Sequence, residues 1–264
     1  MTLVSDANQM KGKGASSPSR DSKHGRVRIF DALRGLSVVS MVLFHFCYDL
    51  TAIQGFELPW FKPPFEDFWR ASISWVFLFI AGIMCSYSRN NFRRSLNYGV
   101  VALLIWVVTM LANIDVPISF GIIYCMFAST LLYAILDLWG IAPRGFVAAV
   151  ALFICFVMCL QISSGIIGFA GMRLKLPQCL YETKLLSWLG FPGPGFSSGD
   201  YYPPLPYSLL FLAGAGIGPD LKAALSGTSI TRFGCPALEF IGRHALEIYI
   251  IHQPTLLLLS GLFS

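Results

Sequence analysis

Residues 145–162 read GFVAAVALFICFVMCLQI and carry no charged side chain. A run of this length approaches the roughly 20 apolar residues that an α-helix needs to cross a hydrocarbon layer about 30 Å thick. Further apolar runs of this kind lie at residues 98–112, 205–218 and 245–263. Runs this long and this frequent exceed what the core helices of a soluble domain require, so the sequence predicts a membrane protein.

The composition of the whole chain agrees with this interpretation. Of 264 residues, 55% are hydrophobic and 12% are charged, whereas about a quarter of the residues of a soluble domain are charged. The net charge of +5 comes from Lys and Arg residues at the ends of the apolar runs, which is typical of membrane topology and argues against a nucleic-acid partner. The 7 cysteines show neither a disulfide framework nor a zinc spacing, so no metal is expected.

We predict an all-α fold, a polytopic membrane bundle of about seven transmembrane helices. The predicted spans are residues 30–51, 71–88, 96–112, 118–137, 145–163, 205–221 and 237–262. Residues 1–28 are rich in Ser, Lys, Arg and Asp and have few apolar side chains to bury, so we expect a disordered cytoplasmic tail. Residues 29–264 then form the transmembrane domain.

The orientation follows from the basic residues, which gather on the side of the tail when successive connections are assigned to alternate sides. Of the 19 Lys and Arg residues, those on the far side are Lys62, Arg70, Arg173, Lys175 and Lys184. The positive-inside rule therefore places the N-terminus in the cytoplasm. Two long segments on the far side, residues 52–70 and 164–204, fit either interfacial lids or plain connections.

The first predicted span contains ionisable residues, which a bilayer tolerates only when they are paired or face a cavity. At 100° per residue, Arg34, His45 and Asp49 fall within about 60° of one another and form a polar stripe. His45 lies roughly 16 Å beyond Arg34 along the axis. His45 and Asp49 are at i and i+4, so the carboxylate is expected to orient the imidazole for acid–base catalysis. A hydrogen-bonded pair that holds helices together is the alternative.

Other polar residues are expected near the two membrane surfaces. His252, two residues before Pro254, is predicted at the outer level of His45, where it fits either a site or helix packing. Asp200 precedes the sixth span, at its outer mouth, or caps that helix. On the inner side, a basic cluster fits either donor phosphates or plain positive-inside charge; its members are Arg89, Asn90, Asn91, Arg93 and Arg94.

Three charged residues in the last predicted span follow at four-residue steps. They are Glu239, Arg243 and Glu247. This spacing places them on one helix face, where opposite charges attract. We therefore expect them to neutralise one another at the inner end of the span.

Five segments, read in order, carry a family resemblance. They are RIFDALRG (28–35), FHFCYDL (44–50), FIAGIMCSYSRNN (79–91), LGFPGPGFSSGDYYP (189–203) and GRHALEIYIIHQP (242–254). Together they resemble the catalytic-domain family of heparan-alpha-glucosaminide N-acetyltransferase, in particular its short bacterial members. The likeness covers residues 28–262, so residues 29–264 are expected to be a transmembrane acyltransferase domain.

The resemblance implies that an acetyl group passes from cytoplasmic acetyl-CoA, used as co-substrate without a metal, to an amine or hydroxyl of a sugar or glycan on the far side. The implied donor-side residues are Arg34 and the basic cluster of Arg89, Asn90, Asn91, Arg93 and Arg94. The implied acceptor-side residues are His45, Asp49, Asp200 and His252. His45 acts as general base or as acyl carrier, and direct transfer and a ping-pong path both remain open.

The same resemblance implies the surroundings of the protein. Membrane lipid, the CoA thioester donor and the glycan acceptor are the expected partners, and a homo-oligomer is allowed. A multi-pass protein of the plasma membrane is expected, with a bacterial inner membrane favoured.

Two departures from the family pattern bear on the chemistry. Where family members often show Phe-Gly-Ile-Leu-His, this chain ends the motif in Tyr124, and residues 52–70 lack the His that the lysosomal enzyme carries in its first lumenal loop. His45 is then the remaining candidate on the first helix, and the acceptor is free to differ. The alternative from another class is a transporter or a lipid- or small-molecule-binding protein that uses the same stripe as its path; dependence on CoA discriminates the two.

Overall fold

The structure is a computed structural model, which describes residues 27–112, 116–169, 171–225, 228 and 234–260. The expected tail lies, up to residue 26, outside the described residues. Arg28, which the sequence analysis assigned to that tail, is instead the first residue of helix α1. Its guanidinium forms an ion pair at 2.9 Å with Glu239, which holds the first turn of α1 against α7.

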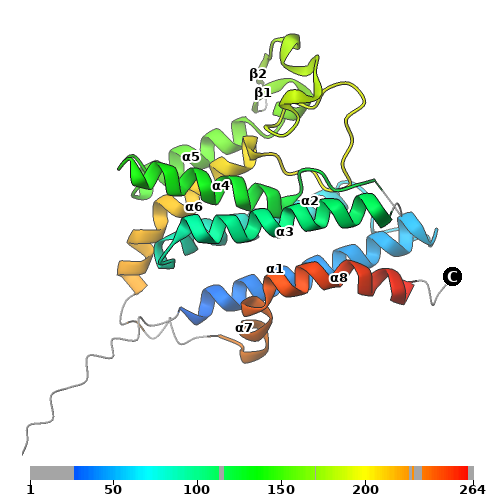
Figure 1. Ribbon diagram of the computed structural model, residues 1–264, viewed down its shortest axis with the longest axis horizontal. Coiled ribbons are helices and arrows are strands. Elements are labelled where there is room, and N and C mark those ends of the chain that lie inside the picture. Colours follow the sequence, from blue (N-terminus) through cyan, green and yellow to red (C-terminus); the bar gives the residue numbers. More distant parts are fainter. Residues whose placement is uncertain (1–26, 113–115, 170, 226–227, 229–233, 261–264) are drawn as a thin grey trace, which may run out of the picture.

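Helices make up most of the molecule and run back and forth between its two ends (Figure 1). They are α1 (Arg28–Tyr48), continued by a π-helical turn (Asp49–Ile53), α2 (Phe65–Ile83), continued by a 3-10 turn (Met84–Tyr87), α3 (Asn91–Ala112), α4 (Ile122–Leu138), α5 (Phe146–Met158), α6 (Pro204–Leu225), α7 (Pro236–Arg243) and α8 (Ala245–Ser260). Within the described residues, five helical stretches are long and apolar enough to cross a membrane: 28–53, 65–87, 91–112, 146–164 and 204–225. Helices α4 and α8 are apolar but shorter.

The last predicted span, residues 237–262, is divided into two helices. The chain leaves helical geometry at His244 (φ −102°, ψ 25°), between α7 and α8. Helix α7 carries Glu239 and Arg243, charges that are costly in an apolar layer. Glu239 pairs with Arg28 of α1, and Glu247 lies on α8, beyond the break. The expected neutralisation of the three charges along one helix is therefore wrong.

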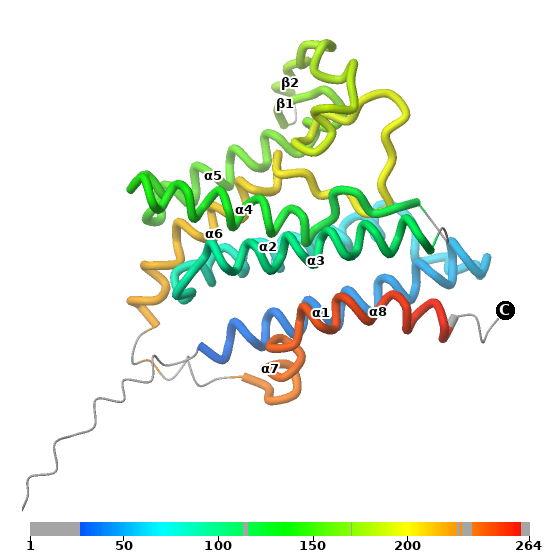
Figure 2. The backbone as a smooth tube through the Cα atoms, viewed as in Figure 1, coloured from blue at the N-terminus to red at the C-terminus, as the bar shows by residue number. Residues whose placement is uncertain are grey.

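Two groups of helices build the molecule. Helix α1 packs against α7 and α8, and these three lie together below the rest of the bundle in Figure 2. In the second group α6 is central, packed against α2, α4 and α5, while α3 packs against α4. The fully buried Leu78, Phe156 and Phe211 form the core of this second group. The two groups meet mainly where α1 packs against α2.

Glycines permit the closest helix crossings. A Cβ atom on Gly82 of α2 would collide with the backbone carbonyl of Phe211, and one on Gly214 of α6 with that of Phe79. Gly35 of α1 and Gly242 of α7 meet in the same way. Small residues let helix backbones approach closely in membrane bundles.

The segment between α5 and α6 contains a two-stranded sheet, so the all-α prediction is wrong there. Strands β1 (Ile166–Phe169) and β2 (Met172–Lys175) pair antiparallel and project from the helices in Figure 1. The surrounding chain forms 3-10 turns at Ile162–Ser164, Gln178–Tyr181 and Lys184–Leu186. The alternation Met172-Arg173-Leu174-Lys175 has the period of two that indicates a strand.

Candidate functional site

Two cavities lie one beyond the other along the bundle, and each is named here by one of its residues. The His45 cavity, of about 330 Å³, is lined by α1, α2, α8 and the segment before α6. The Arg94 cavity, of about 290 Å³, lies nearer the start of α1 and the end of α2, and is lined by Arg34, Arg94 and Arg243 among others. Phe77 and Ala245 line both cavities. Of the stripe predicted on the first helix, His45 lines one cavity and Arg34 the other, whereas Asp49 lines neither of the two.

The predicted catalytic residues divide between the cavity wall and the layer behind it. His45 and Asp200 line the His45 cavity. The ring of His252 lies behind His45, with ring centroids 5.0 Å apart. Nδ1 of His252 is 2.7 Å from the Tyr249 carbonyl oxygen, so Nδ1 must carry the proton of that hydrogen bond. In the neutral ring Nε2 is then an acceptor, and it is buried without a hydrogen-bond partner among the described residues.

Asp49 is fully buried and contacts the last helix. Its carboxylate oxygens accept hydrogen bonds from Nε2 of Gln253 at 3.0 and 3.3 Å. The expected orientation of His45 by Asp49 stays a prediction, since the structure places the His45 ring against His252 and the Asp49 carboxylate against Gln253. These two contacts hold α1 and α8 together at the level of the imidazoles.

Asp200 joins three elements at the His45 cavity. Its Oδ2 accepts a hydrogen bond from the backbone N–H of Ile122 at 3.0 Å, at the start of α4, and its carboxylate interacts with the Tyr249 side chain. A Cβ atom at position 121 would lie 2.7 Å from Oδ2, which explains Gly121. Burial raises the pKa of Asp200 to about 6, against the opposing effect of the Ile122 hydrogen bond. The Asp200 carboxyl group thus links the segment before α6 to α4 and α8, and its burial disfavours its charged form.

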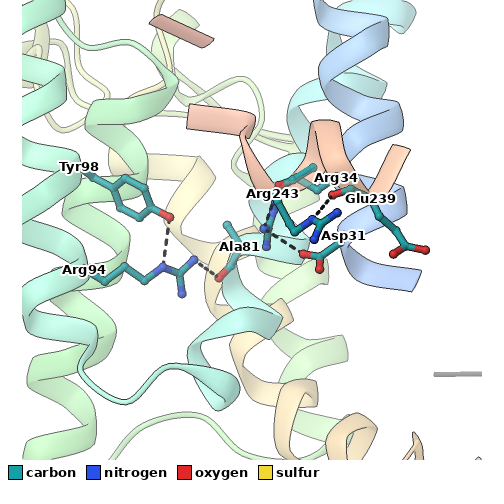
Figure 3. Close-up of polar contacts among 8 residues, drawn as sticks. Asp31, Arg34, Ala81, Arg94, Tyr98, Glu239 and Arg243 are labelled. Carbon is teal, nitrogen blue, oxygen red and sulfur yellow. Dashed lines mark hydrogen bonds and ion pairs between the residues drawn. The ribbon is translucent and has the colours of Figure 1, made fainter. Parts of the chain in front are cut away.

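The Arg94 cavity is cationic (Figure 3). Arg94 reaches from α3 toward α2, where Nη2 donates to the Ala81 carbonyl at 3.0 Å and Nε donates to the Tyr98 hydroxyl at 3.1 Å. Arg34 lies across the cavity on α1, 3.7 Å from the Asp31 carboxylate. Arg243 donates to the Glu239 carbonyl at 3.2 Å. Among the described residues, the hydrogen-bond partners of the Arg94 guanidinium are neutral, so its charge is available to an anionic ligand.

A third cavity, the Arg89 cavity, adjoins the Arg94 cavity at Ser88, which lines both. It measures about 680 Å³ and is lined by Arg89, Asn90, Asn91 and the basic residues Arg144 and Lys222. The predicted donor-side residues are therefore divided: Arg34 lines the Arg94 cavity, whereas Arg89, Asn90 and Asn91 line the Arg89 cavity. Arg93 is exposed.

Comparison with known proteins gave one family match. The profile of the family described as heparan-alpha-glucosaminide N-acetyltransferase, catalytic, matches residues 26–254. The chain belongs to this family. The match covers most of the chain and includes all the residues placed at the cavities above. Neither the curated proteins nor the solved structures gave a match.

Family membership makes the chain a membrane protein of an acetyltransferase family. Sequence reasoning found the basic cluster around the start of α3, with Arg94 as a member, but did not single out Arg94 as the residue that lines a cavity beside α2. Its signal was the i, i+4 spacing of Arg94 and Tyr98, which places a cation and a hydroxyl on one face of a predicted span. Tyr249 was also missed, although it lies three residues before His252 and on the same helix face.

Proposed function

We propose that the protein transfers an acetyl group from cytoplasmic acetyl-CoA to an amine or hydroxyl of a sugar or glycan on the other side of the membrane. The observation that carries this proposal is the pair of cavities with a common wall: one is cationic, and the other holds an imidazole and a carboxyl group. A donor thioester and an acceptor are then held on opposite sides of one short barrier.

The donor is assigned to the two basic cavities. Arg34, Arg94 and Arg243 surround the space for the acyl-bearing arm of CoA, and Arg89 and Lys222 supply charge for its phosphates. Arg144 lines the same cavity but lies 3.5 Å from the Asp137 carboxylate. Arginine suits this role because its planar guanidinium donates two parallel hydrogen bonds to a phosphate. Ser88 marks the point where the two parts of the molecule would join.

The chemistry is assigned to the His45 cavity. The acceptor attacks the thioester carbonyl carbon, a C–N or C–O bond forms, and the C–S bond breaks. His45 takes the proton that the acceptor loses, and the departing thiolate takes up a proton to become the CoA thiol. His252 lies in ring contact with His45 and holds it in place, while Asp200, Tyr249 and Arg70 offer polar contacts to the acceptor.

The proposed function needs seven spans across a plasma membrane, with the N-terminus on the cytoplasmic side. Supporting it, Arg89, Arg94, Arg144 and Lys222 belong to turns and helix ends at the end of the molecule where α1 begins (Figure 1). Helices α4 and α8, although short, run alongside the longer ones.

The first test is acetyl-CoA turnover by the purified protein in detergent, with a panel of amino sugars. His45→Ala is compared with His244→Ala, because His244 lies at the junction of α7 and α8 with its side chain 48% exposed. We expect a loss of about 10²–10⁴-fold for His45→Ala, the usual contribution of a general base, and less than 3-fold for His244→Ala. A folded wild-type protein that binds no CoA would overturn the proposal and favour a transporter.

A second measurement separates direct transfer from an acyl-enzyme path. The wild-type protein is incubated with acetyl-labelled CoA in the absence of acceptor, and protein-bound label is measured. Label that is retained by the wild type and lost in His45→Ala supports an acetyl-imidazole intermediate. Turnover with acceptor but no retained label supports direct transfer.

A further inference from the structure

The wall between the His45 and Arg94 cavities lies on one continuous helix face. Arg70, Ser74, Phe77 and Ala81 follow along α2 at steps of four, three and four residues, and so project to the same side. Arg70 and Ser74 line the His45 cavity, Ala81 lines the Arg94 cavity, and Phe77 lines both. Phe77 is therefore the position at which one chamber ends and the other begins.

The boundary between the two cavities also passes through the start of α8. Ala245 lines both cavities, Tyr249 one turn later lines the His45 cavity, and Leu246 lines the Arg94 cavity. Ala245 is buried, at 6% exposure. Two residues of very different size, one from each helix group, thus form the part of the wall that both chambers share.

We infer that Phe77 and Ala245 form a septum that limits the length of the acyl group passing from donor to acceptor. This inference rests on the proposed function, in which the acyl carbon is exchanged between sulfur and the acceptor atom at this wall. The bonds made and broken are the same for every acyl group, so selectivity comes only from the space beside the phenyl ring. An acetyl group adds one methyl to the carbonyl, whereas longer chains must displace the ring.

The test compares acetyl-, propionyl-, butyryl- and hexanoyl-CoA as donors for the wild type, Phe77→Ala and Ala245→Val. Val76→Ala is the matched control, because Val76 is the neighbouring residue on α2 and its side chain is 42% exposed on the outer surface. For Phe77→Ala we expect the ratio of kcat/KM for butyryl-CoA over acetyl-CoA to rise at least 10-fold. A methylene in an apolar pocket commonly changes specificity by about 10–200-fold.

Ala245→Val narrows the same wall, so its propionyl-to-acetyl ratio is expected to fall, while Val76→Ala keeps the wild-type ratios. Unchanged ratios in an active, folded Phe77→Ala protein overturn the septum and leave the proposed function intact. If the wild type neither binds nor turns over any acyl-CoA, the proposed function fails and the septum with it. Phe77→Leu, judged by the same ratio, replaces Phe77→Ala if that variant does not fold.

Discussion

Arg94 donates hydrogen bonds to a hydroxyl, a thiol and a backbone carbonyl. Those partners orient the guanidinium without cancelling its charge. A cation held in this way costs free energy in the empty bundle, and an anionic ligand offsets that cost. At the scale of single residues, Arg94 is therefore the strongest candidate for donor binding.

We predict that Arg94→Met weakens CoA binding at least 10-fold, which corresponds to about 1.4 kcal/mol, while Arg93→Met changes it less than 2-fold. The two substitutions remove the same charge from adjacent positions, but Arg93 is exposed. Isothermal titration with CoA in detergent measures both. A larger effect of Arg93→Met would show that phosphates bind at the surface and not in the Arg94 cavity.

Asp200 gives a prediction on pH and stability. Its pKa is about 6 in the folded protein against an ordinary value of 3.8, so between these values the folded state holds a proton that the unfolded state releases. Stability contributed by Asp200 therefore falls as the pH rises from about 4 to 6, by about 2 kcal/mol. Asn at this position has no charge to bury.

Thermal melts of the wild type and Asp200→Asn at pH 4.5 and 7.5 check this prediction. The Tm of the wild type relative to the variant is expected to be higher at pH 4.5 than at pH 7.5. A difference in Tm that is the same at both pH values would show that burial leaves the carboxyl group unperturbed.

At the scale of helices, the glycine crossings set how closely α2 and α6 approach. We predict that Gly214→Ala lowers the free energy of unfolding by about 1–3 kcal/mol, because the added methyl group collides with the Phe79 carbonyl and the backbones must separate. Gly216→Ala on the same helix is the control, since its Cβ atom would meet nothing nearer than 3.7 Å. Thermal melts in detergent compare the two.

For Gly216→Ala we expect an unchanged or slightly higher Tm, since Ala is a better helix former than Gly. Equal losses of Tm for the two variants would mean that these glycines serve helix flexibility rather than close packing.

Most helices could be predicted from the sequence, because the length and periodicity of the apolar runs determine where helices form. The runs at 98–112 and 145–162 lie within or largely within helices, as predicted. The break at His244 interrupts an apolar run that has no sequence signal for it. The pairing of Glu239 with Arg28 was also not predictable, because the two residues lie more than 200 positions apart in the chain. The β1–β2 hairpin was hidden by its position in a segment rich in turn residues.

At the scale of the whole molecule, the cysteines of the chain report its orientation. Cys179 and Cys235 are both exposed and lie on opposite sides in the proposed topology. We predict that a membrane-impermeant maleimide labels Cys179 in intact cells and labels Cys235 only after permeabilisation. Cys179→Ser and Cys235→Ser identify the labelled positions.

The opposite pattern would place the N-terminus outside and would contradict the positive-inside assignment. It would also move the basic cavities to the side where cytoplasmic CoA is absent, so the proposed function depends on this result.

The candidate site was predictable in part. An ionisable side chain in an apolar span is conspicuous, and this signal identified His45 and Arg34, which line the two cavities. The partners of these residues were not predictable, because they come from other helices: His252 contacts His45, and Gln253 contacts Asp49. The shared wall at Phe77 also depends on tertiary packing, since its aromatic side chain resembles any other in an apolar run.

The pairing of α1 with α7 and α8 has a consequence for biosynthesis. Both cavities take one wall from α1 and another from residues 242–249, which leave the ribosome long after α1 has entered the membrane. Until then α1 can pack against α2 but not against α7 or α8. Asp49, in the π-helical turn that continues α1, then lacks the hydrogen bonds from the Gln253 amide. In the nascent protein both cavities therefore lack one wall, and they are completed only when its early and late helices assemble.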